Sequence, residues 1–235
     1  MIRTLLWDVD GTLLDFHASE RAAMTACFAS RGLGPYTDEM AARYAAINLR
    51  YWEALERGEM TKAQILTERF REFFGEYGVV CGDIDGYNEE YQYRLGDTIV
   101  FRDDGYQLVE SLRGRVRQYA VTNGTSAAQT RKLRNSGLDG LFDGVFISDQ
   151  VGFEKPAQGF FDYVFAHIPP CPRREIMIVG DSLTSDMRGG VGAGVVCCWY
   201  NPFGAANTPG LPIDVTIRSL NEVPALLDRA YGTAT

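Results

Sequence analysis

Four acidic residues and one lysine have a spacing that suits phosphate and metal chemistry. Asp8 and Asp10 are two residues apart, so in extended backbone their side chains point to the same side. Asp181 and Asp186 follow much later, and Lys155 lies between the two pairs in the chain. Carboxylates are the hard oxygen ligands that Mg²⁺ prefers. The pattern predicts a site for a divalent cation and a phosphate group, with Lys155 as a further positive charge.

These residues follow short apolar runs, as would be expected at strand ends. The run Thr4–Trp7 leads into Asp8, and further runs occupy 117–121, 144–147, 176–179 and 195–200. Uninterrupted apolar runs of this length are typical of strands buried on both faces of a parallel sheet. Helical patterns lie between them, at 106–112, 126–136, 160–167 and 184–189. The alternation predicts an α/β fold with a doubly wound, mostly parallel sheet, whose ligands bind beyond the carboxyl ends of the strands.

One long segment interrupts this alternation. Residues 16–98 carry four successive helical patterns, at 18–31, 38–57, 61–74 and 84–95, separated by glycine-containing turns. We therefore expect an all-helical cap domain at 16–98, inserted into a core made of residues 1–15 and 99–235. Most aromatic residues of this segment are expected to form the core of the cap.

Four segments, in this order, resemble the signature segments of the haloacid dehalogenase superfamily of phosphohydrolases. They are Asp8–Thr12, Thr122-Asn123, Lys155-Pro156 and Gly180-Asp181 through Asp186. A closer similarity, to the house-cleaning pyrimidine 5′-nucleotidases, rests on residues 13–16, Asn48 with Trp52, 147–156 and 198–202. Gly11 departs from that subfamily, which often has an acidic residue there. The resemblance covers essentially the whole chain, and it implies a helical cap of the first type known in that superfamily.

The resemblance implies a role for each acid. Asp8 would be the nucleophile that forms an aspartyl-phosphate, because a carboxylate is already ionised at pH 7 and needs no activating base. Asp10 would protonate the leaving alkoxide and then deprotonate the attacking water. Mg²⁺ would be held by Asp8, Asp10 through its carbonyl group, and Asp181. Asp186 would complete the metal site through water or orient the nearby lysine.

The resemblance also implies the phosphate-binding groups. These are the hydroxyl of Thr122, the backbone N–H groups of Asn123 and Gly124, and the amine of Lys155; Thr122 and Lys155 would also act in catalysis. The presence of Asp10 favours a phosphatase over a dehalogenase, because a halide leaving group needs no proton.

Three residues of the predicted cap are candidates for contacting the substrate. Phe16 would stack on a nucleobase, while Asn48 and Trp52 lie four residues apart on one helical face. The alternative is that these side chains pack the cap core. The resemblance to the nucleotidases implies that the substrate is a nucleoside 5′-monophosphate, most specifically a pyrimidine nucleotide. Two other readings stay open: a phosphatase for a sugar phosphate or phosphoglycolate, and a regulatory module that is only phosphorylated on Asp8.

Composition limits the possible partners. The 235 residues carry 31 acidic and 23 basic side chains, for a formal net charge of −8. Polymeric nucleic acid and anionic membrane surfaces would be repelled, whereas a small phosphorylated metabolite is compatible with local positive charge. The first residues reach Asp8 too soon for a signal peptide, and the five cysteines include no CxxC pair. These features predict a cytoplasmic protein.

Overall fold

The protein is built around one six-stranded sheet in residues 1–231, which are the residues that the computed structural model describes. Residues 232–235 of the predicted core lie outside the described part. The strands are β1 (Thr4–Trp7), β2 (Arg117–Thr122), β3 (Gly144–Ile147), β4 (Ile176–Gly180), β5 (Val196–Tyr200) and β6 (Val215–Ile217). Their order is β3-β2-β1-β4-β5-β6 and every neighbouring pair is parallel. The predicted doubly wound α/β fold is confirmed, and β6 is a strand that sequence reasoning missed.

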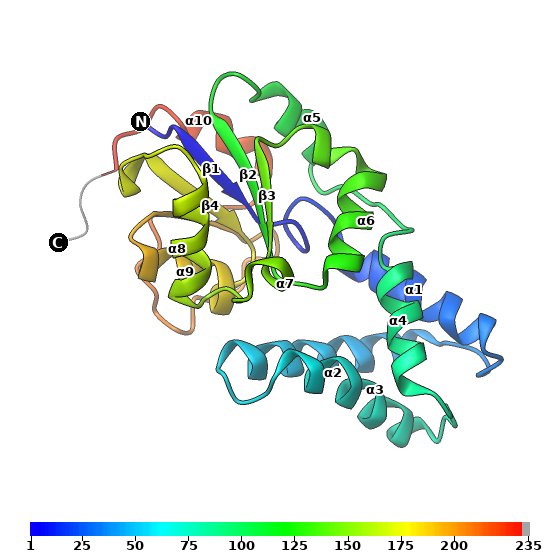
Figure 1. Ribbon diagram of the computed structural model, residues 1–235. Coiled ribbons are helices and arrows are strands. Elements are labelled where there is room, and N and C mark those ends of the chain that lie inside the picture. The colour runs from blue at the N-terminus through cyan, green and yellow to red at the C-terminus, as the bar shows by residue number, and fades with distance from the viewer. Residues whose placement is uncertain (232–235) are drawn as a thin grey trace.

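Helices cover both faces of this sheet (Figure 1). The core helices are α5 (Gly105–Ser111), α6 (Ser126–Ser136), α7 (Ser148–Val151), α8 (Gln158–His167), α9 (Arg188–Ala193) and α10 (Val223–Leu226). Helices α5 and α6 lie on one side of the sheet, and α8 and α9 on the other (Figure 1). Side chains of β1 alternate accordingly: Leu5 and Trp7 pack with α5, α6 and α10, whereas Leu6 packs with α8 and α9.

One predicted core helix has a different form. The segment expected at 184–189 is a π-helical turn, η3 (Leu183–Met187), followed by α9. Three short 3₁₀ helices complete the described core: η1 (Leu138–Gly140), η2 (Arg173–Glu175) and η4 (Leu220–Glu222). Wider turns of this kind often occur at functional sites, and η3 carries Asp186.

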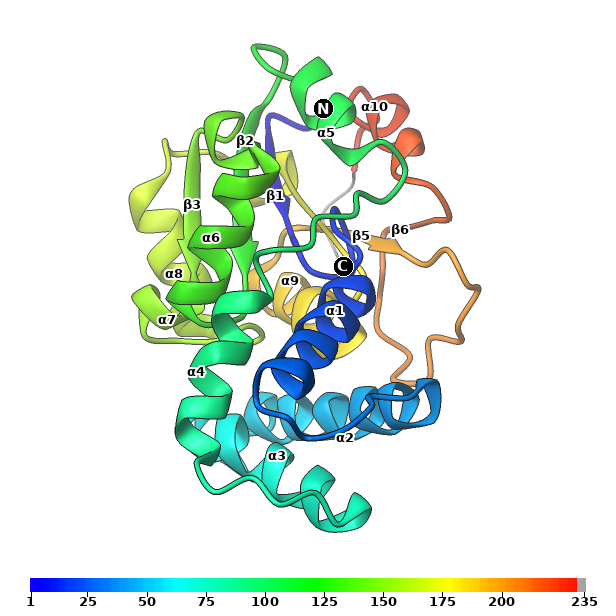
Figure 2. The same ribbon diagram turned by 90° about the vertical axis from the view of Figure 1, so that its right-hand side faces the viewer.

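The chain between β1 and α5 forms four helices, called the cap below. They are α1 (Phe16–Ser30), α2 (Asp38–Glu56), α3 (Lys62–Tyr77) and α4 (Ile84–Arg94). Buried aromatic rings from all four helices form its own core, among them Phe28, Tyr44, Phe70, Phe73 and Tyr91. A capping box formed by Thr61 and Gln64 starts α3. Figures 1 and 2 show that α2 and α3 lie beyond the end of the sheet at which β1 leads into α1.

The chain crosses between core and cap at two neighbouring points. Leu14 and Phe101 form an antiparallel bridge, and the Asp15 N–H donates to the Val100 carbonyl at 2.8 Å. Arg102 also lies 3.2 Å from the Asp15 carboxylate. The two connections therefore run side by side, which is the arrangement of a two-stranded hinge.

In residues 1–231, no helix combines the length and apolarity needed to span a bilayer.

Candidate active site

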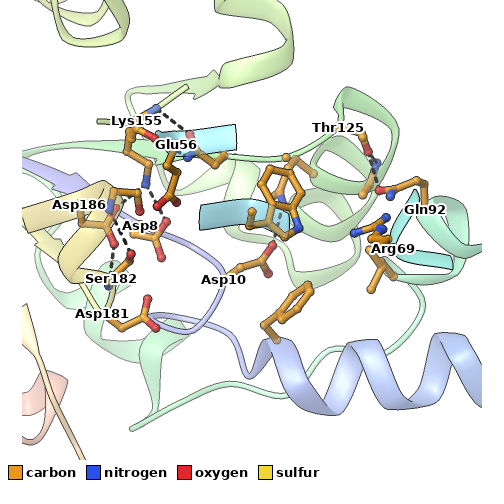
Figure 3. A pocket seen from close by; sticks show the side chains of 18 residues that line it. Asp8, Asp10, Glu56, Arg69, Gln92, Thr125, Lys155, Asp181, Ser182 and Asp186 are labelled. Atoms are coloured by element: carbon orange, nitrogen blue, oxygen red, sulfur yellow. Dashed lines mark hydrogen bonds and ion pairs between the residues drawn. The ribbon is translucent and has the colours of Figure 1, made fainter. Parts of the chain in front are cut away.

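A cavity of about 170 Å³ lies where the carboxyl ends of the strands face the cap. Figure 3 shows its lining side chains, with Asp8, Asp181, Asp186 and Lys155 at one end and Arg69, Gln92 and Thr125 at the other. The lining residues are Asp8, Asp10, Phe16, Trp52, Glu56, Arg69, Gln92, Leu95, Asn123, Gly124, Thr125, Ala128, Gln129, Lys155, Asp181, Ser182, Ser185 and Asp186. The cavity therefore joins the predicted chemical residues of the core to side chains of the cap.

Three carboxylates meet at one end of this cavity. Asp8 directly follows β1 and Asp181 directly follows β4, and these two strands are paired with Trp7 opposite Val179. Parallel neighbours end at the same edge of a sheet, so the acids come together. With Asp186 from η3, they offer oxygen atoms that all lie within 4.8 Å of one another. This set of oxygen donors is suited to a hard divalent cation.

The amine of Lys155 neutralises part of this charge. It is buried and lies 2.8 Å from Asp8 Oδ1 and 2.6 Å from Asp186 Oδ1. It also donates to the Val121 carbonyl at 2.7 Å. The backbone of Lys155 is held by Asn123, whose side-chain amide both donates to its carbonyl and accepts from its N–H at 2.9 Å. Asn123 therefore fixes the lysine that follows β3 to the end of β2.

Negative charge still exceeds positive charge at this end. Burial, followed by repulsion from Asp186, raises the pKa of Asp8 well above its usual value. The same two causes raise the pKa of Asp181 to about 7. Burial would lower the pKa of Lys155, but the attraction of Asp186 and Asp8 outweighs it and the pKa is raised. The cluster therefore favours binding of an additional cation, either a proton or a metal ion.

The loop after β1 packs tightly on two of these acids. The Thr12 hydroxyl lies 2.9 Å from Asp8 Oδ2 and 3.2 Å from Asp181 Oδ1. Gly11 has a φ of +91°, and a Cβ atom there would lie 2.5 Å from Asp181 Oδ2. Any side chain at this position would be strained in its backbone and would displace the Asp181 carboxylate.

The carboxylate of Asp10 lies apart from the three-acid cluster. Its Oδ2 accepts from Gln129 Nε2 at 2.7 Å, and its Oδ1 is paired with the amine of Lys132. Lys132 is fully buried, and its amine also lies 5.3 Å from the centre of the Phe16 ring. Both partners of Asp10 come from α6, three residues apart on one helical face. The structure thus holds the side chain of Asp10 away from the metal ligands; a metal contact through its carbonyl group stays a prediction.

The predicted phosphate loop lies only partly on the cavity wall. Asn123 and Gly124 line it, whereas Thr122 is fully buried and its hydroxyl lies 3.3 Å from the Asn123 carbonyl. The Gly124 N–H lies 3.2 Å from the hydroxyl of Ser148. Contacts of Thr122 and of the Gly124 N–H with phosphate therefore stay predictions.

The cap residues proposed for substrate contact divide into two groups. Phe16 and Trp52 line the cavity together with Glu56, whose pKa burial raises to about 7. Asn48 does not line it. Its amide donates to Glu20 at 2.7 Å and accepts from Arg69 at 2.7 Å, so Asn48 connects two buried charged groups. It also reaches the wall of a second cavity, which adjoins the first at Phe16 and Trp52.

Several polar cavity residues were missed by sequence reasoning: Glu56, Arg69, Gln92, Thr125 and Gln129. Arg69 had a detectable signal, because it is a charged residue spaced four from Ile65 and four from Phe73 on the buried face of α3. Gln129 and Lys132 likewise share the face of α6 that begins at the predicted phosphate loop.

Comparisons with known proteins agree on one family. The family model described as haloacid dehalogenase-like hydrolase matches residues 2–194. The chain is 39% identical to the HAD-hydrolase YfnB of Bacillus subtilis over 228 residues, which are 96% of this chain and 95% of that protein. It is 35% identical to the pyrimidine 5′-nucleotidase PynA of Streptococcus pneumoniae, covering 84% and 83% of the two chains, and 30% identical to the pyrimidine 5′-nucleotidase YjjG of Escherichia coli, covering 82% and 84%.

A solved structure is similar over the same extent. The crystal structure of YfnB from Bacillus subtilis bound to magnesium superposes with a TM-score of 0.90 at 37% identity, and the match covers 97% of this chain and 99% of that chain. That structure is described as revealing interdomain movement.

Proposed function

Because the chain belongs to the haloacid dehalogenase-like hydrolase family, we propose that it is a Mg²⁺-dependent phosphatase that hydrolyses nucleoside 5′-monophosphates, most specifically those of pyrimidines. The observation that carries this proposal is the cluster of Asp8, Asp181 and Asp186 around the buried amine of Lys155. A carboxylate nucleophile, oxygen ligands for a metal and a fixed cation are the groups that phosphoryl transfer requires.

The donor set fits Mg²⁺. Its three carboxylates are hard oxygen ligands, and burial followed by repulsion from Asp186 raises the pKa values of Asp8 and Asp181, so that an additional cation is favoured there. Asp8, Asp181 and Asp186 would hold the ion, with the backbone carbonyl of Asp10 as the further ligand proposed from the family resemblance. When bound, Mg²⁺ supplies positive charge that lets a phosphate dianion approach these acids.

The residues of the chain then divide the reaction into two steps. In the first, an Asp8 oxygen attacks phosphorus, the bond from phosphorus to the leaving oxygen breaks, and Asp10 gives that oxygen a proton. In the second, Asp10 takes a proton from water, whose oxygen attacks phosphorus and releases Asp8 with inorganic phosphate. Lys155 stays beside Asp8 and stabilises the charge on the transferring group.

The substrate assignment is supported by the named relatives and by the cavity. Two relatives with 30% and 35% identity are pyrimidine 5′-nucleotidases. Phe16 and Trp52 give the cavity aromatic surface on which a nucleobase can stack. Closure of the cap over the strand ends would exclude water during transfer.

Release of inorganic phosphate tests this proposal. The purified protein with Mg²⁺ is assayed against dUMP, dTMP, UMP, ribose 5-phosphate, glucose 6-phosphate and phosphoglycolate, with Asp8→Asn as the inactive control. We expect the highest kcat/KM for the pyrimidine nucleotides. A higher value for a sugar phosphate or phosphoglycolate would replace the nucleotidase assignment with the corresponding phosphatase, and phosphate release by Asp8→Asn would rule out Asp8 as nucleophile.

A further inference from the structure

The end of the cavity remote from the acids carries a buried arginine. Arg69 is 1% exposed and lines the cavity, and its guanidinium packs over the rings of Phe70 and Tyr91, with Cζ 4.8 Å and 5.3 Å from their centres. Figure 3 shows it across the cavity from Asp8, with Asp10 lying between the two. A cation held at this place can act on the part of a substrate that lies farthest from the phosphate.

The guanidinium of Arg69 is incompletely paired. One Nη donates to Asn48 Oδ1 at 2.7 Å and the other to Asn88 Oδ1 at 3.2 Å, both of which are neutral amides. Its Nε is buried without a hydrogen-bond partner. Among residues 1–231, no carboxylate lies within ion-pair distance of it. A buried cation with an unsatisfied donor is costly, so a ligand acceptor at this position would be strongly favoured.

Neighbouring amides extend the polar surface around Arg69. Gln92 accepts from the Thr125 hydroxyl at 2.9 Å and donates to Asn88 Oδ1 at 3.2 Å, which leaves one amide hydrogen of Gln92 uncommitted. The Oε1 atom of Gln129 is buried, lines the same cavity and has no partner. Arg69 and Gln92 therefore bring two kinds of donor to the remote end, while Gln129, whose Nε2 contacts Asp10, adds an unpartnered acceptor elsewhere in the cavity lining.

Asn48 holds the arginine in place. Its amide group links Arg69 to the carboxylate of Glu20, which is itself only 4% exposed. The charge of Glu20 thus balances Arg69 through one intervening side chain, and the Glu20 carboxylate forms no ion pair with the guanidinium itself. This arrangement keeps the cation buried and available.

We propose that Arg69, assisted by Gln92, is the specificity-determining residue of this site and binds an oxygen acceptor at the end of the substrate opposite the phosphate. This inference rests on the proposed phosphatase function. Two sources supply such an oxygen: a ring carbonyl of a pyrimidine base, and the carboxylate of a phosphorylated acid. The N–H groups of Arg69 can donate to either kind of oxygen. They give no binding energy to a phosphate ester that lacks such a carbonyl or carboxylate.

Three substrates distinguish these cases. UMP carries the base carbonyls, ribose 5-phosphate has the same phosphoester without the base, and 3-phosphoglycerate carries a carboxylate. We expect Arg69→Met to lower kcat/KM roughly 10- to 100-fold for UMP, the loss typical of a charged hydrogen bond, and to change ribose 5-phosphate by less than about threefold. The control is Arg71→Met, because Arg71 lies on the same helix but pairs with Glu68 on the surface.

The possible results test the role of Arg69 separately from the nucleotidase assignment. A loss confined to UMP assigns the base carbonyl, and a loss confined to 3-phosphoglycerate assigns the carboxylate; both support the proposal. Equal losses for UMP and ribose 5-phosphate, or no loss for any oxygen-bearing substrate, overturn it. Failure of the wild-type protein to hydrolyse UMP would instead contradict the nucleotidase assignment.

A melting curve and a second variant test whether loss of structure explains a loss of activity. Arg69→Met leaves Asn48 Oδ1 without a donor and removes one of the two donors to Asn88 Oδ1, so its thermal melting curve is measured beside the kinetics. Gln92→Leu removes the other donor with a smaller change in the cap, and we expect it to lower kcat/KM for the acceptor-bearing substrate about 5- to 10-fold more than for ribose 5-phosphate. Equal effects of Gln92→Leu on the two substrates would also overturn the proposal.

Discussion

The amine of Lys62 in the cap lies 2.8 Å from the carboxylate of Glu154, the residue that precedes Lys155 in the core. The same amine lies 3.2 Å from the Gly124 carbonyl and 3.2 Å from the Ser148 hydroxyl. One cap side chain thus contacts the predicted phosphate loop and the segment that carries Lys155. The two chain crossings between cap and core lie elsewhere, at Leu14 and Phe101, so Lys62 adds a separate contact that can hold the cap and the core together.

We predict that Lys62→Ala shifts the cap toward an open position. The two partly exposed ion pairs, with Glu154 and Asp149, and the two hydrogen bonds are together worth about 1 kcal/mol, so KM should rise roughly three- to tenfold while the melting temperature changes little. Small-angle scattering with and without substrate should show incomplete closure in the variant. The control is Arg57→Ala, which breaks ion pairs that stay within the cap. An unchanged KM together with wild-type scattering curves would argue against a latch.

In the first step, which kcat/KM reports, Asp10 is predicted to matter only where the leaving group needs a proton. Asp10→Asn should lower kcat/KM for ribose 5-phosphate by about 10²- to 10⁴-fold, because its alkoxide is a poor leaving group. The same variant should change kcat/KM for p-nitrophenyl phosphate less than about tenfold, because p-nitrophenolate leaves unprotonated. Similar losses on both substrates would show that Asp10 does not serve as the acid.

Lys132 is predicted to position Asp10. It is fully buried and paired with the Asp10 carboxylate, so Lys132→Met should free that side chain and lower kcat/KM for ribose 5-phosphate about tenfold. The discriminating measurement is again p-nitrophenyl phosphate, whose kcat/KM should hardly change. If Lys132 were purely structural, Lys132→Met would lower kcat/KM for both substrates alike. That result would contradict the positioning role.

Asp8→Asn is predicted to abolish turnover and to stabilise the metal-free protein. The carboxylate of Asp8 is buried and repelled by Asp186, which raises its pKa well above the usual value, so a neutral amide removes an unfavourable charge. We expect a melting temperature roughly 3–6 °C above wild type at about pH 8 in EDTA. Asp228→Asn, at an exposed acid, is the control and should change neither property. A lower melting temperature for Asp8→Asn would contradict the charge argument.

The metal-free protein is predicted to lose stability as pH rises toward 8. The pKa of Asp181 is raised from 3.8 to about 7 in the folded state, mainly by burial. Between these values the folded chain binds a proton that the unfolded chain releases, so this stabilisation is present at low pH and is lost as pH rises through 7. Melting temperatures in EDTA should therefore be higher at about pH 5.5 than at about pH 8.

Addition of Mg²⁺ should reverse this dependence. The ion competes with protons for Asp8, Asp181 and Asp186, so about 5 mM Mg²⁺ should raise the melting temperature more at about pH 8 than at about pH 5.5. Equal stabilisation at both pH values would indicate that the ion binds elsewhere.

The sequence was informative about the polar side chains that directly follow the predicted strands. The runs before Asp8 and Asp181 predict strands of one parallel sheet, whose carboxyl ends lie at the same edge. The structure adds that the two strands are neighbours. Lys155 could be expected at this edge as well, because it follows the strand predicted at 144–147 by a short loop. By contrast, β6 was missed because its three residues, only one of them buried, carry too short a pattern.

The cap was less predictable. Its helical content and aromatic core follow from local periodicity, but periodicity does not specify which polar residue on a helix faces the core domain. Asn48 and Arg69 lie on different helices, and only their tertiary contact shows that Asn48 supports the arginine that lines the cavity. The same holds for Lys132 and Asp10, which are 122 residues apart in the chain.

The sequence by itself determined the sheet, the acids at its strand ends and the helical insertion, because each depends on local patterns of apolar and polar residues. Only the tertiary structure decided the remote end of the cavity and the partners of Asp10. Those depend on how two helical faces meet, and a buried charge such as Arg69 can be assigned a role only when its partners are known.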